Sequence, residues 1–498
     1  MCSQDLSWLV GELRALTHDL DAGAAPSPLI VAIDQGGHAS RAIAFDRQGV
    51  AIAESFAAIS TFRTGSDRVE HDAIEVTESV RTALTDLYQA LGAESHRVVA
   101  AGLATQRSSI ACWDARTNQP LSPILSWQDR RNAAFVAKLQ PHASEIRELT
   151  GLVLSPHYGA SKLRWCLENV DAVAKAHAAK RLRLGPIAAW LLRSLLTERP
   201  NVVDAVNAAR TQLLDIRERG WSPQLLKYFG VPAEALPRVV ASRHAFGYVA
   251  FGDRSIPLLA CTGDQSAMPF AHGRPDPHTL YLNIGTGAFL QRVTSALHAP
   301  QGLLASVLWT QEHDGATEVT YACEGTVNGA ASAIDWVNDR IGIDAHRTAQ
   351  ALTRANVASL LPPIFVNGIA GVGSPYWRSQ LESRFVGEGS EIACVTAVIE
   401  SIAFLICKNV ELMGHDTRQL LASGGLSASN YLCECVATLS GLPVERTSLQ
   451  ESTATGLAYL TAGQPPDWQP DAKLQTFAPA ADAALAARYQ QWQTLMSA

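Results

Sequence analysis

The stretch Leu29–Ala58, LIVAIDQGGHASRAIAFDRQGVAIAESFAA, decides the fold. It predicts three strands separated by two turns: a strand over 29–33, a turn at Gln35-Gly36-Gly37, a strand over 41–45, a turn over 46–49 and a strand from Val50. Two successive glycines let the backbone approach an anionic group, and their amides can point towards it. Asp34, directly before this turn, is unsuited to direct phosphate binding but suited to holding a hydrated magnesium ion beside a phosphate. The stretch therefore indicates a nucleotide site.

The pattern of a buried strand followed by glycines recurs twice later in the chain. Residues 280–284 run into Gly285-Thr286-Gly287, and residues 420–423 run into Gly424-Gly425. A lone glycine turn is weak evidence, because most such turns only reverse the chain. Three phosphate-compatible turns in one chain suggest instead a nucleotide clamped between two similar halves.

Length and composition limit the classes of protein to which this chain can belong. Its 498 residues exceed what one core supports and fit two domains of roughly 200 to 250 residues each. Hydrophobic residues make up 47% and charged residues 17%, a globular balance that argues against disorder. The net charge of −7 and the lack of a long basic run argue against nucleic acid as a partner. No stretch reaches the ~18 uninterrupted apolar residues of a membrane helix, so we expect no membrane insertion.

The N-terminal segment and the cysteines point to a cytoplasmic protein. Residues 1–26 are acidic and lack an apolar core, so they do not form a secretory signal. Their leucines recur at helical spacing, which predicts an amphipathic helix that caps the fold or, alternatively, forms a contact in a homo-oligomer. Nine scattered cysteines, an odd number, make neither a disulfide framework nor a metal site and favour buried reduced thiols.

Further elements follow from capping signals and hydrophobic periodicity. Asp72 is a plausible N-cap for a long helix, and Glu75 stands three residues on, as a capping box requires. A buried strand over 98–104 precedes a return strand over 110–113. Further helices are expected over 73–91, 160–169, 183–196, 324–336, 395–413, 430–439 and 454–462.

Three side chains outside the glycine turns are candidates for substrate chemistry. Arg107 follows the strand over 98–104, where α/β proteins place ligand contacts, although it could equally brace its own loop. Trp127 could form a flat wall against the carbon atoms of a polyol or could belong to the core. Asp264 lies where an apolar strand ends and a helix begins, so it is either an N-cap or a general base that accepts a hydroxyl proton.

Eleven segments between about Leu29 and Ala462 resemble, in this order, the motifs of the FGGY carbohydrate kinase family, and within it most closely the glycerol kinases. They are AIDQG with SRAIAFD (from Ala32), VEHD (Val69), TQR (Thr105), WQDRR (Trp127), SKLRW (Ser161), NAARTQLLDI (Asn207), GDQ (Gly263), GTGAF (Gly285), GSPYW (Gly373), IESIAF (Ile399) and SGG (Ser423). The resemblance implies an α/β fold of two actin-like, ribonuclease-H-like ATPase domains with a cleft between them. It also implies ATP with Mg²⁺ as cofactors and phosphorylation of a hydroxyl of a small polyol or sugar. The expected divisions are an N-terminal helical extension (1–26), a substrate and phosphate domain (27–272), a nucleotide domain (273–463) and a C-terminal tail (464–498).

The resemblance also implies roles for individual positions. Asp264 would take the proton from the attacking hydroxyl, and Asp34 would hold Mg²⁺ through water. The substrate would be contacted by Arg107, Ser108, Trp127, His157, Gln265 and Phe289. The phosphates and the nucleotide would be lined by Gly36, Gly37, Arg41, Thr286, Gly287, Ala331, Gly425 and Ser429.

Departures from the glycerol kinase pattern bear on the substrate and on the phosphate turn. Ser108 stands where the pattern has a glutamate that accepts from a glycerol hydroxyl, and His157 replaces a tyrosine. A larger or differently substituted polyol or ketose could use this room, with His157 as a donor; alternatively Tyr158 shifts in and glycerol still binds. Residues 37–39, Gly-His-Ala, replace three hydroxyl residues near the phosphates.

Two hypotheses for the function follow from these residues. The first is an active ATP-dependent polyol or sugar kinase, which the retention of Asp34, Arg107, Asp264 and Thr286 favours. The second is a catalytically weak member that binds ligand or nucleotide as a sensor, which the altered turn at 37–39 favours. An actin- or chaperone-like ATPase shares the fold but gives no reason for Arg107, Trp127 and Asp264.

Overall fold

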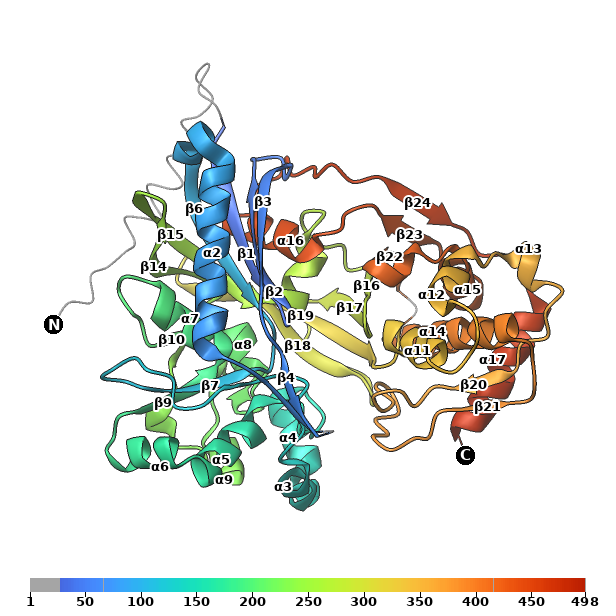
Figure 1. Cartoon of the computed structure of the whole chain (residues 1–498), viewed down its shortest axis with the longest axis horizontal. Coiled ribbons are helices and arrows are strands. Elements are labelled where there is room, and N and C mark those ends of the chain that lie inside the picture. Colours follow the sequence, from blue (N-terminus) through green and yellow to red (C-terminus); the bar gives the residue numbers. More distant parts are fainter. Residues whose placement is uncertain (1–26, 66, 415, 498) are drawn as a thin grey trace. The chain divides into compact units, whose positions relative to one another are not determined.

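The computed structural model describes residues 27–65, 67–414 and 416–497, and the chain separates into two compact units (Figure 1). Unit 1 holds the chain up to Arg274 together with Ser306–Tyr321 and Glu451–Asp471. Unit 2 holds Pro275–Ala305, Ala322–Gln450 and Ala472–Ala498. The amphipathic helix predicted for residues 1–26 lies outside the described residues, and homo-oligomerisation stays a prediction.

Unit 1 is built on a six-stranded sheet with the strand order β14-β15-β6-β1-β2-β3. The strands are β1 (Leu29–Gln35), β2 (Ala39–Phe45), β3 (Ala51–Ala58), β6 (Val98–Thr105), β14 (Arg243–Phe251) and β15 (Arg254–Gly263). β1, β6 and β15 are parallel neighbours, so their carboxyl ends meet at one edge of the sheet. All residues of β1 are buried, as a strand covered on both faces requires, whereas the edge strand β3 alternates between exposed and half-buried residues.

A second sheet and the helices of unit 1 surround this core. The five-stranded sheet has the order β4-β5-β8-β7-β9, with β4 (Phe62–Thr64), β5 (Arg68–His71), β7 (Ile110–Asp114), β8 (Ile124–Leu125) and β9 (Leu182–Pro186). Two short pairs are β10 (Val202–Asp204) with β13 (Arg238–Val240) and β11 (Leu214–Asp215) with β12 (Gly220–Trp221). The helices are α2 (Ala73–Leu91), α3 (Ala133–Lys138), α4 (Ala143–Thr150), α5 (Gly159–Asn169), α6 (Asp171–Ala178), α7 (Ile187–Leu195), α8 (Ala205–Ala209), α9 (Pro223–Phe229), α10 (Asp264–Ala267) and α16 (Ser452–Thr461).

Helix α2 covers the sheet along β2 and β3 and begins and ends where the sequence predicts (Figure 1). The Asp72 carboxylate accepts hydrogen bonds from the amides of Ile74 and Glu75, which confirms the N-cap. The capping box is wrong, because the Glu75 carboxylate accepts from the amide and hydroxyl of Ser60 instead. Glu75 thus ties the helix to the end of β3 rather than to its own cap.

Helix α16 brings the chain back into unit 1 and packs against α10. A Cβ at Gly456 would lie 2.0 Å from the carbonyl oxygen of Ala267, and one at Gly102 would lie 2.2 Å from Oγ1 of Thr461. Only glycine leaves room for these two approaches. The short helix α10, which carries Asp264, is therefore held in place by α16, a segment almost two hundred residues away in the sequence.

Unit 2 is organised around parallel strands β16 and β22 in the order β17-β16-β22-β23-β24. The strands are β16 (Thr279–Ile284), β17 (Ala288–Thr294), β22 (Gln419–Ser423), β23 (Val444–Thr447) and β24 (Leu474–Phe477), with a separate pair β20 (Ile364–Val366) and β21 (Arg384–Val386). The helices are α11 (Ala331–Asn338), α12 (Ala345–Ala351), α13 (Arg354–Val357), α14 (Glu391–Met413), α15 (Asn430–Ser440) and α17 (Ala483–Ser497). The hairpin β18 (Leu304–His313) and β19 (Ala316–Val327) contributes its residues 306–321 to unit 1.

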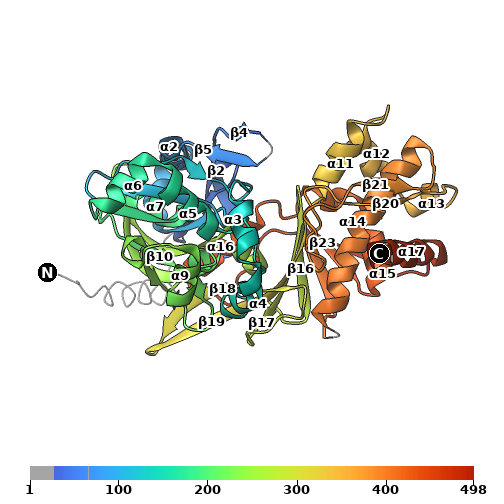
Figure 2. The same cartoon turned by 90° about the horizontal axis from the view of Figure 1, so that it is seen from below.

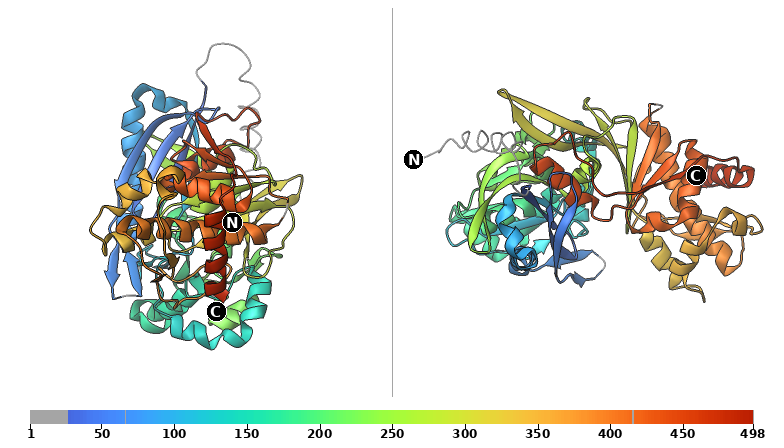
Figure 3. Two further views of the ribbon diagram at one scale, coloured as in Figure 1. Left: turned by 90° about the vertical axis from the view of Figure 1, so that its right-hand side faces the viewer. Right: turned by 90° about the horizontal axis from the view of Figure 1, so that it is seen from above.

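The C-terminal segment predicted as a tail after residue 463 contains ordered elements of unit 2. β24 pairs with β23, and α17 packs beside α14 and α15 (Figures 2 and 3). The Trp492 ring lies 5.7 Å from that of Phe404, and Arg488 bonds the buried carboxylate of Glu400. The segment therefore completes the hydrophobic core around α14.

Three predicted elements differ from the structure. Residues 183–186 belong to β9 rather than to a helix, because Pro186 lacks an amide hydrogen and instead precedes α7 as its N-cap. β7, predicted as a return strand beside β6, pairs with β8 and β9 in the second sheet.

The helix predicted to open at Glu324 begins only at Ala331, because residues 324–327 continue strand β19. Glu324 is buried and accepts a hydrogen bond from the side-chain amide of Gln291 at 2.6 Å. This partner comes from β17, so local propensity could not show it.

All eight described cysteines are free thiols, and seven are buried. In the part of the chain that the structure describes, no helix is long and apolar enough to cross a membrane.

Candidate active site

Asp34, the last residue but one of the central strand β1, is buried. Its Oδ1 has no hydrogen-bond partner among the described residues. Burial raises the pKa of Asp34 to about 7, and the negative charges of Asp264 and Glu451 add to this shift while Arg41 opposes it. Burying a charge without a partner costs free energy, so the Asp34 carboxylate is stabilised when it binds a proton or a cation.

The surroundings of Asp34 fit a hydrated magnesium ion. Within residues 27–65, 67–414 and 416–497, no group of three or more His, Cys, Asp or Glu side chains is placed to hold a metal. Mg²⁺ usually keeps several waters and takes one or two carboxylates plus phosphate oxygens. Asp34 supplies one such carboxylate, with Oδ1 unpartnered among the described residues, beside the turn at Gly36 and Gly37.

Asp264 stands at the junction of β15 and α10, at the same sheet edge as Asp34. The N-cap position of α10 is taken by Gly263, so the interpretation of Asp264 as an N-cap is wrong. Its Oδ1 accepts from the amide of Gln265 at 2.7 Å, and 25% of its side chain is exposed. Asp264 is therefore oriented by the backbone yet reachable by a ligand.

Arg107 lies directly against Asp264. Its Nε is 3.7 Å from Oδ1 of Asp264, and its Nη1 donates to Oγ of Ser266 at 3.5 Å. Gly263 makes the room, because a Cβ there would lie 2.5 Å from Cγ and 2.6 Å from Cδ of Arg107. Arg107 thus contacts the acid at the end of β15 and does more than brace its own loop.

Replacing Gly263 by alanine is expected to lower kcat/KM by roughly 10- to 100-fold, because the new methyl group must displace Arg107 and misplacement by about 1 Å carries losses of this size. Steady-state kinetics measure the effect. Gly220→Ala is the control, since a Cβ at Gly220 meets nothing within 4 Å. Equal losses in both variants, or no loss in Gly263→Ala, would argue against the positioning of Arg107.

Glu451 is a site residue that the sequence analysis missed. It precedes α16, and its Oε1 lies 3.5 Å from Nε of Arg41 on β2. Its charge contributes to the raised pKa of Asp34. No local pattern marks Glu451, because it joins the site only through the return of the chain into unit 1.

Trp127 and His157 form an aromatic wall in unit 1. Their ring centroids are 5.7 Å apart, and the Trp127 amide donates to Oγ of Ser109 at 2.9 Å. Nε1 of Trp127 would lie 3.8 Å from a Cβ at Gly37, so the wall reaches the glycine turn after β1. Trp127 is half-buried, as a surface for the carbon atoms of a substrate requires.

Ser108 sits beside Arg107 in an unusual backbone conformation. Its φ is 66°, it is buried, and its hydroxyl has no partner among the described residues. A non-glycine residue in the left-handed region is uncommon and aims its side chain where an extended residue would not. Gln265, the other predicted substrate contact here, is half-buried next to Asp264.

In unit 2, the two later glycine turns come together. β16 and β22 pair in parallel with Asn283 opposite Ser423, so their turns lie at one sheet edge. Gly424 has a φ of 86°, and a Cβ there would lie 2.4 Å from Oδ1 of Asn283. Gly425 is exposed, with nothing within 4 Å of a Cβ.

The turn that contains Thr286 and Gly287 is docked on the start of α11. The Thr286 carbonyl accepts from the amides of Ala330 and Ser332, and the amide of Ala331 donates to the Gly285 carbonyl. Thr286 is itself exposed. The structure thus brings Thr286, Gly287, Ala331 and Gly425 together at the edge formed by β16 and β22.

The remaining predicted residues of unit 2 differ in their availability. Phe289 is half-buried on β17, opposite Asn283. The Ser429 hydroxyl is engaged in the fold, because it donates to the Ala349 carbonyl at 3.0 Å and caps α15. A nucleotide contact through the Ser429 side chain would therefore compete with these bonds.

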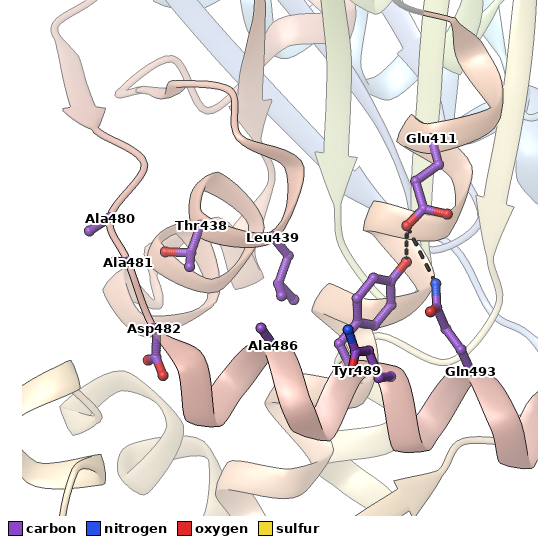
Figure 4. Close-up of a pocket in the computed structure, with 10 residues that line it drawn as sticks. Glu411, Thr438, Leu439, Ala480, Ala481, Asp482, Ala486, Tyr489 and Gln493 are labelled. Atoms are coloured by element: carbon purple, nitrogen blue, oxygen red, sulfur yellow. Dashed lines mark hydrogen bonds between the residues drawn. The ribbon is translucent and has the colours of Figure 1, made fainter.

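A hollow of about 370 Å³ in unit 2 contains none of the predicted site residues (Figure 4). It lies between α15 and α17, and its hydrogen bonds join the Glu411 carboxylate to Tyr489 and Gln493. These bonds hold α17 to α14, so the hollow belongs to the packing of the C-terminal helix.

Comparison with known proteins places this geometry in a family. Family models for the N-terminal and C-terminal domains of the FGGY family of carbohydrate kinases match residues 29–271 and 280–464. A glycerol kinase of Synechocystis sp. is 34% identical over 447 residues, covering 86% of this chain and 90% of that protein. A glycerol kinase of Acaryochloris marina is 32% identical over 485 residues, covering 93% and 97%.

Solved structures of other kinases have a similar fold. Glycerol kinase of Plasmodium falciparum with ADP has a TM-score of 0.82 at 20% identity, covering 96% of this chain and 99% of that one. Xylulose kinase of Rhodospirillum rubrum has a TM-score of 0.81 at 19% identity, covering 94% and 98%. At such identities the likeness shows the fold, and it confirms the predicted pair of actin-like α/β domains. The chain belongs to the FGGY family of carbohydrate kinases and is an ATP-dependent kinase of a sugar or polyol.

Proposed function

We propose that Asp264 is the general base of this kinase and that Arg107 positions both Asp264 and the substrate. The observation that carries the proposal is the meeting of three chain segments at one sheet edge: Asp34 near the end of β1, Arg107 after β6 and Asp264 after β15. Phosphoryl transfer needs little covalent help from the protein and depends on alignment and charge stabilisation. These residues supply both.

In the reaction, Asp264 accepts the proton of the attacking hydroxyl as that oxygen bonds to the γ-phosphorus of ATP. The bond between the γ-phosphorus and the bridging oxygen breaks, and ADP leaves with the electron pair. Trp127 and His157 pack against the acceptor and limit access of water, which otherwise competes as a nucleophile.

We assign Asp34 as the residue that holds Mg²⁺, through water, beside the phosphates. When bound, the ion would neutralise charge that develops on the transferred phosphoryl group. The orphaned Oδ1 and the raised pKa of Asp34 support this assignment. The glycine turns after β16 and β22 are the proposed nucleotide contacts of unit 2.

The sensor hypothesis gains no support from these observations. The altered residues 37–39 leave the turn after β1 closed by a hydrogen bond from the Gly36 amide to the Ala39 carbonyl at 2.9 Å. A coupled assay of ADP release over glycerol, tetritols, pentitols, ketoses and the corresponding acids tests the proposal. We expect acceptor-dependent ADP release; ATP binding without turnover on any acceptor would favour a sensor.

A further inference from the structure

Four basic side chains lie near His157 in unit 1. Burial holds the pKa of His157 well below its usual value, and the positive charges of Arg130, Lys162, Arg210 and Arg107 add to this shift. The Arg130 guanidinium donates to Nδ1 of His157 at 3.4 Å, and Lys162 donates to the His157 carbonyl at 2.8 Å. His157 is thus a neutral imidazole with Nδ1 as acceptor, which leaves its Nε2–H as a donor.

The hydrogen bonds of the Arg130 guanidinium run to neutral groups. Its Nη1 donates to the carbonyls of Trp127 and Asp129, and its Nη2 reaches His157, so its direct partners are all neutral. The charge of Asp129 acts on Arg130, and the Asp129 carboxylate is bonded by the Arg131 guanidinium and the Val69 amide. Arg131 also pairs with Glu70.

Lys162 and Arg210 are two further basic residues that act on His157. Lys162 is fully buried and donates to the carbonyls of Ser126 and His157, and burial lowers its pKa strongly. Arg210 lies over the Tyr158 ring at 5.4 Å. The positive charges that act on His157, and the neutral character of the groups that Arg130 bonds directly, suit an anionic group.

Ser108 supplies the second observation that points to a ligand. Its hydroxyl is buried without a partner, and its chain neighbours on both sides belong to this cluster. Arg107 acts on His157, and Ser109 accepts from the Trp127 amide at 2.9 Å. A serine hydroxyl can donate to an anion and, unlike a glutamate, does not repel one.

We propose that the acceptor of this kinase is a small polyhydroxy carboxylate, bound through its carboxylate by Arg130, Ser108 and His157 and phosphorylated on a hydroxyl at the Asp264 end. The proposal rests on the kinase function proposed above and names its substrate class. An arginine, an imidazole N–H and a hydroxyl are donors that a carboxylate accepts well. The carboxylate takes no part in the reaction, so the bonds that form and break are those described above for a hydroxyl acceptor.

Matched pairs of acceptors test the proposal in the ADP-release assay. The pairs are glycerol and glycerate, erythritol and erythronate, xylitol and xylonate, and glucitol and gluconate. We expect kcat/KM for one acid to exceed that of its neutral partner by at least about 10-fold, since charged hydrogen bonds are the stronger ones. Equal or better use of the neutral partners would overturn this inference and leave the kinase function standing. No turnover with any of the eight compounds would also overturn this inference, and it would contradict the kinase function only if the ketoses of the wider panel fail as well.

Two substitutions at Ser108, of similar size but different charge, distinguish the effect of charge on kcat/KM from the effect of side-chain size. Ser108→Glu is expected to lower kcat/KM for the acid on the order of 100-fold, as like charges about 5 Å apart do at the effective dielectric of a protein. Ser108→Gln has nearly the same size without the charge, so it should lose much less. Equal losses in the two variants, with unchanged melting temperatures, would mean that the site does not bind a carboxylate there. A variant that fails to fold leaves the acceptor pairs as the deciding measurement.

Discussion

Replacing Asp264 by asparagine should lower kcat by about 10²- to 10⁴-fold, the range that a general base contributes, while leaving ATP binding intact. Asparagine keeps the size of the side chain and an oxygen that can accept from the Gln265 amide. Because Gly263 holds the N-cap position, the substitution removes no cap from α10. The expected loss is therefore one of proton acceptance rather than of folding.

Kinetics and nucleotide binding measured on the same preparation check this prediction. Asp314→Asn is the matched control, since Asp314 is 86% exposed and its positive φ suits asparagine. We expect the control to retain full activity and the melting temperature of both variants to stay near that of the parent. A kcat for Asp264→Asn within a factor of a few of the parent would refute its role as the base.

Replacing Asp34 by asparagine should weaken the apparent affinity for Mg²⁺ on the order of 100-fold, as the loss of a metal-orienting group does.

The same substitution should raise the stability of the metal-free protein at high pH, whereas a merely destabilising mutation would lower it. The pKa of Asp34 is about 7 in the folded chain, above its ordinary 3.8. The folded state therefore binds this proton more tightly than the unfolded state, and stability is lost as pH rises from about 4 through 7.

Asparagine has no such proton to lose. Without metal, Asp34→Asn should melt at a higher temperature than the parent at pH 8, and this difference should shrink at pH 5. Melting curves in EDTA at the two pH values provide the measurement, and a Mg²⁺ titration of activity provides the second readout. A variant that melts lower than the parent at pH 8 would show that the Asp34 carboxylate is satisfied by the fold itself.

The residues that the sequence could identify are those whose role is local. The apolar run before Asp34, the two glycines after it and the Gly263-Asp264 junction each carry their signal within a few positions, and the structure has them where they were predicted. The bounds of α2 and the Asp72 cap follow for the same reason. Pro186 is an equally local signal against a helix over 183–186, but the helical periodicity of the residues that follow it obscures this signal.

The residues that the sequence could not identify depend on distant partners. Glu451 acts on Asp34 only because α16 returns to unit 1, and Glu324 stays in a strand because Gln291 pairs with it. Arg107 fits beside Asp264 only because Gly263 has no side chain, and no sequence pattern relates Gly263 to Arg107. The basic cluster around His157 likewise joins side chains from four separate segments.

The most direct test is the structure of a complex with the acceptor and a non-hydrolysable ATP analogue. We predict that the phosphorylated hydroxyl oxygen lies about 2.6–3.2 Å from a carboxylate oxygen of Asp264, the reach of a general base. A hydroxyl bound in line with the γ-phosphate but beyond the reach of Asp264, even through one water, would contradict the account.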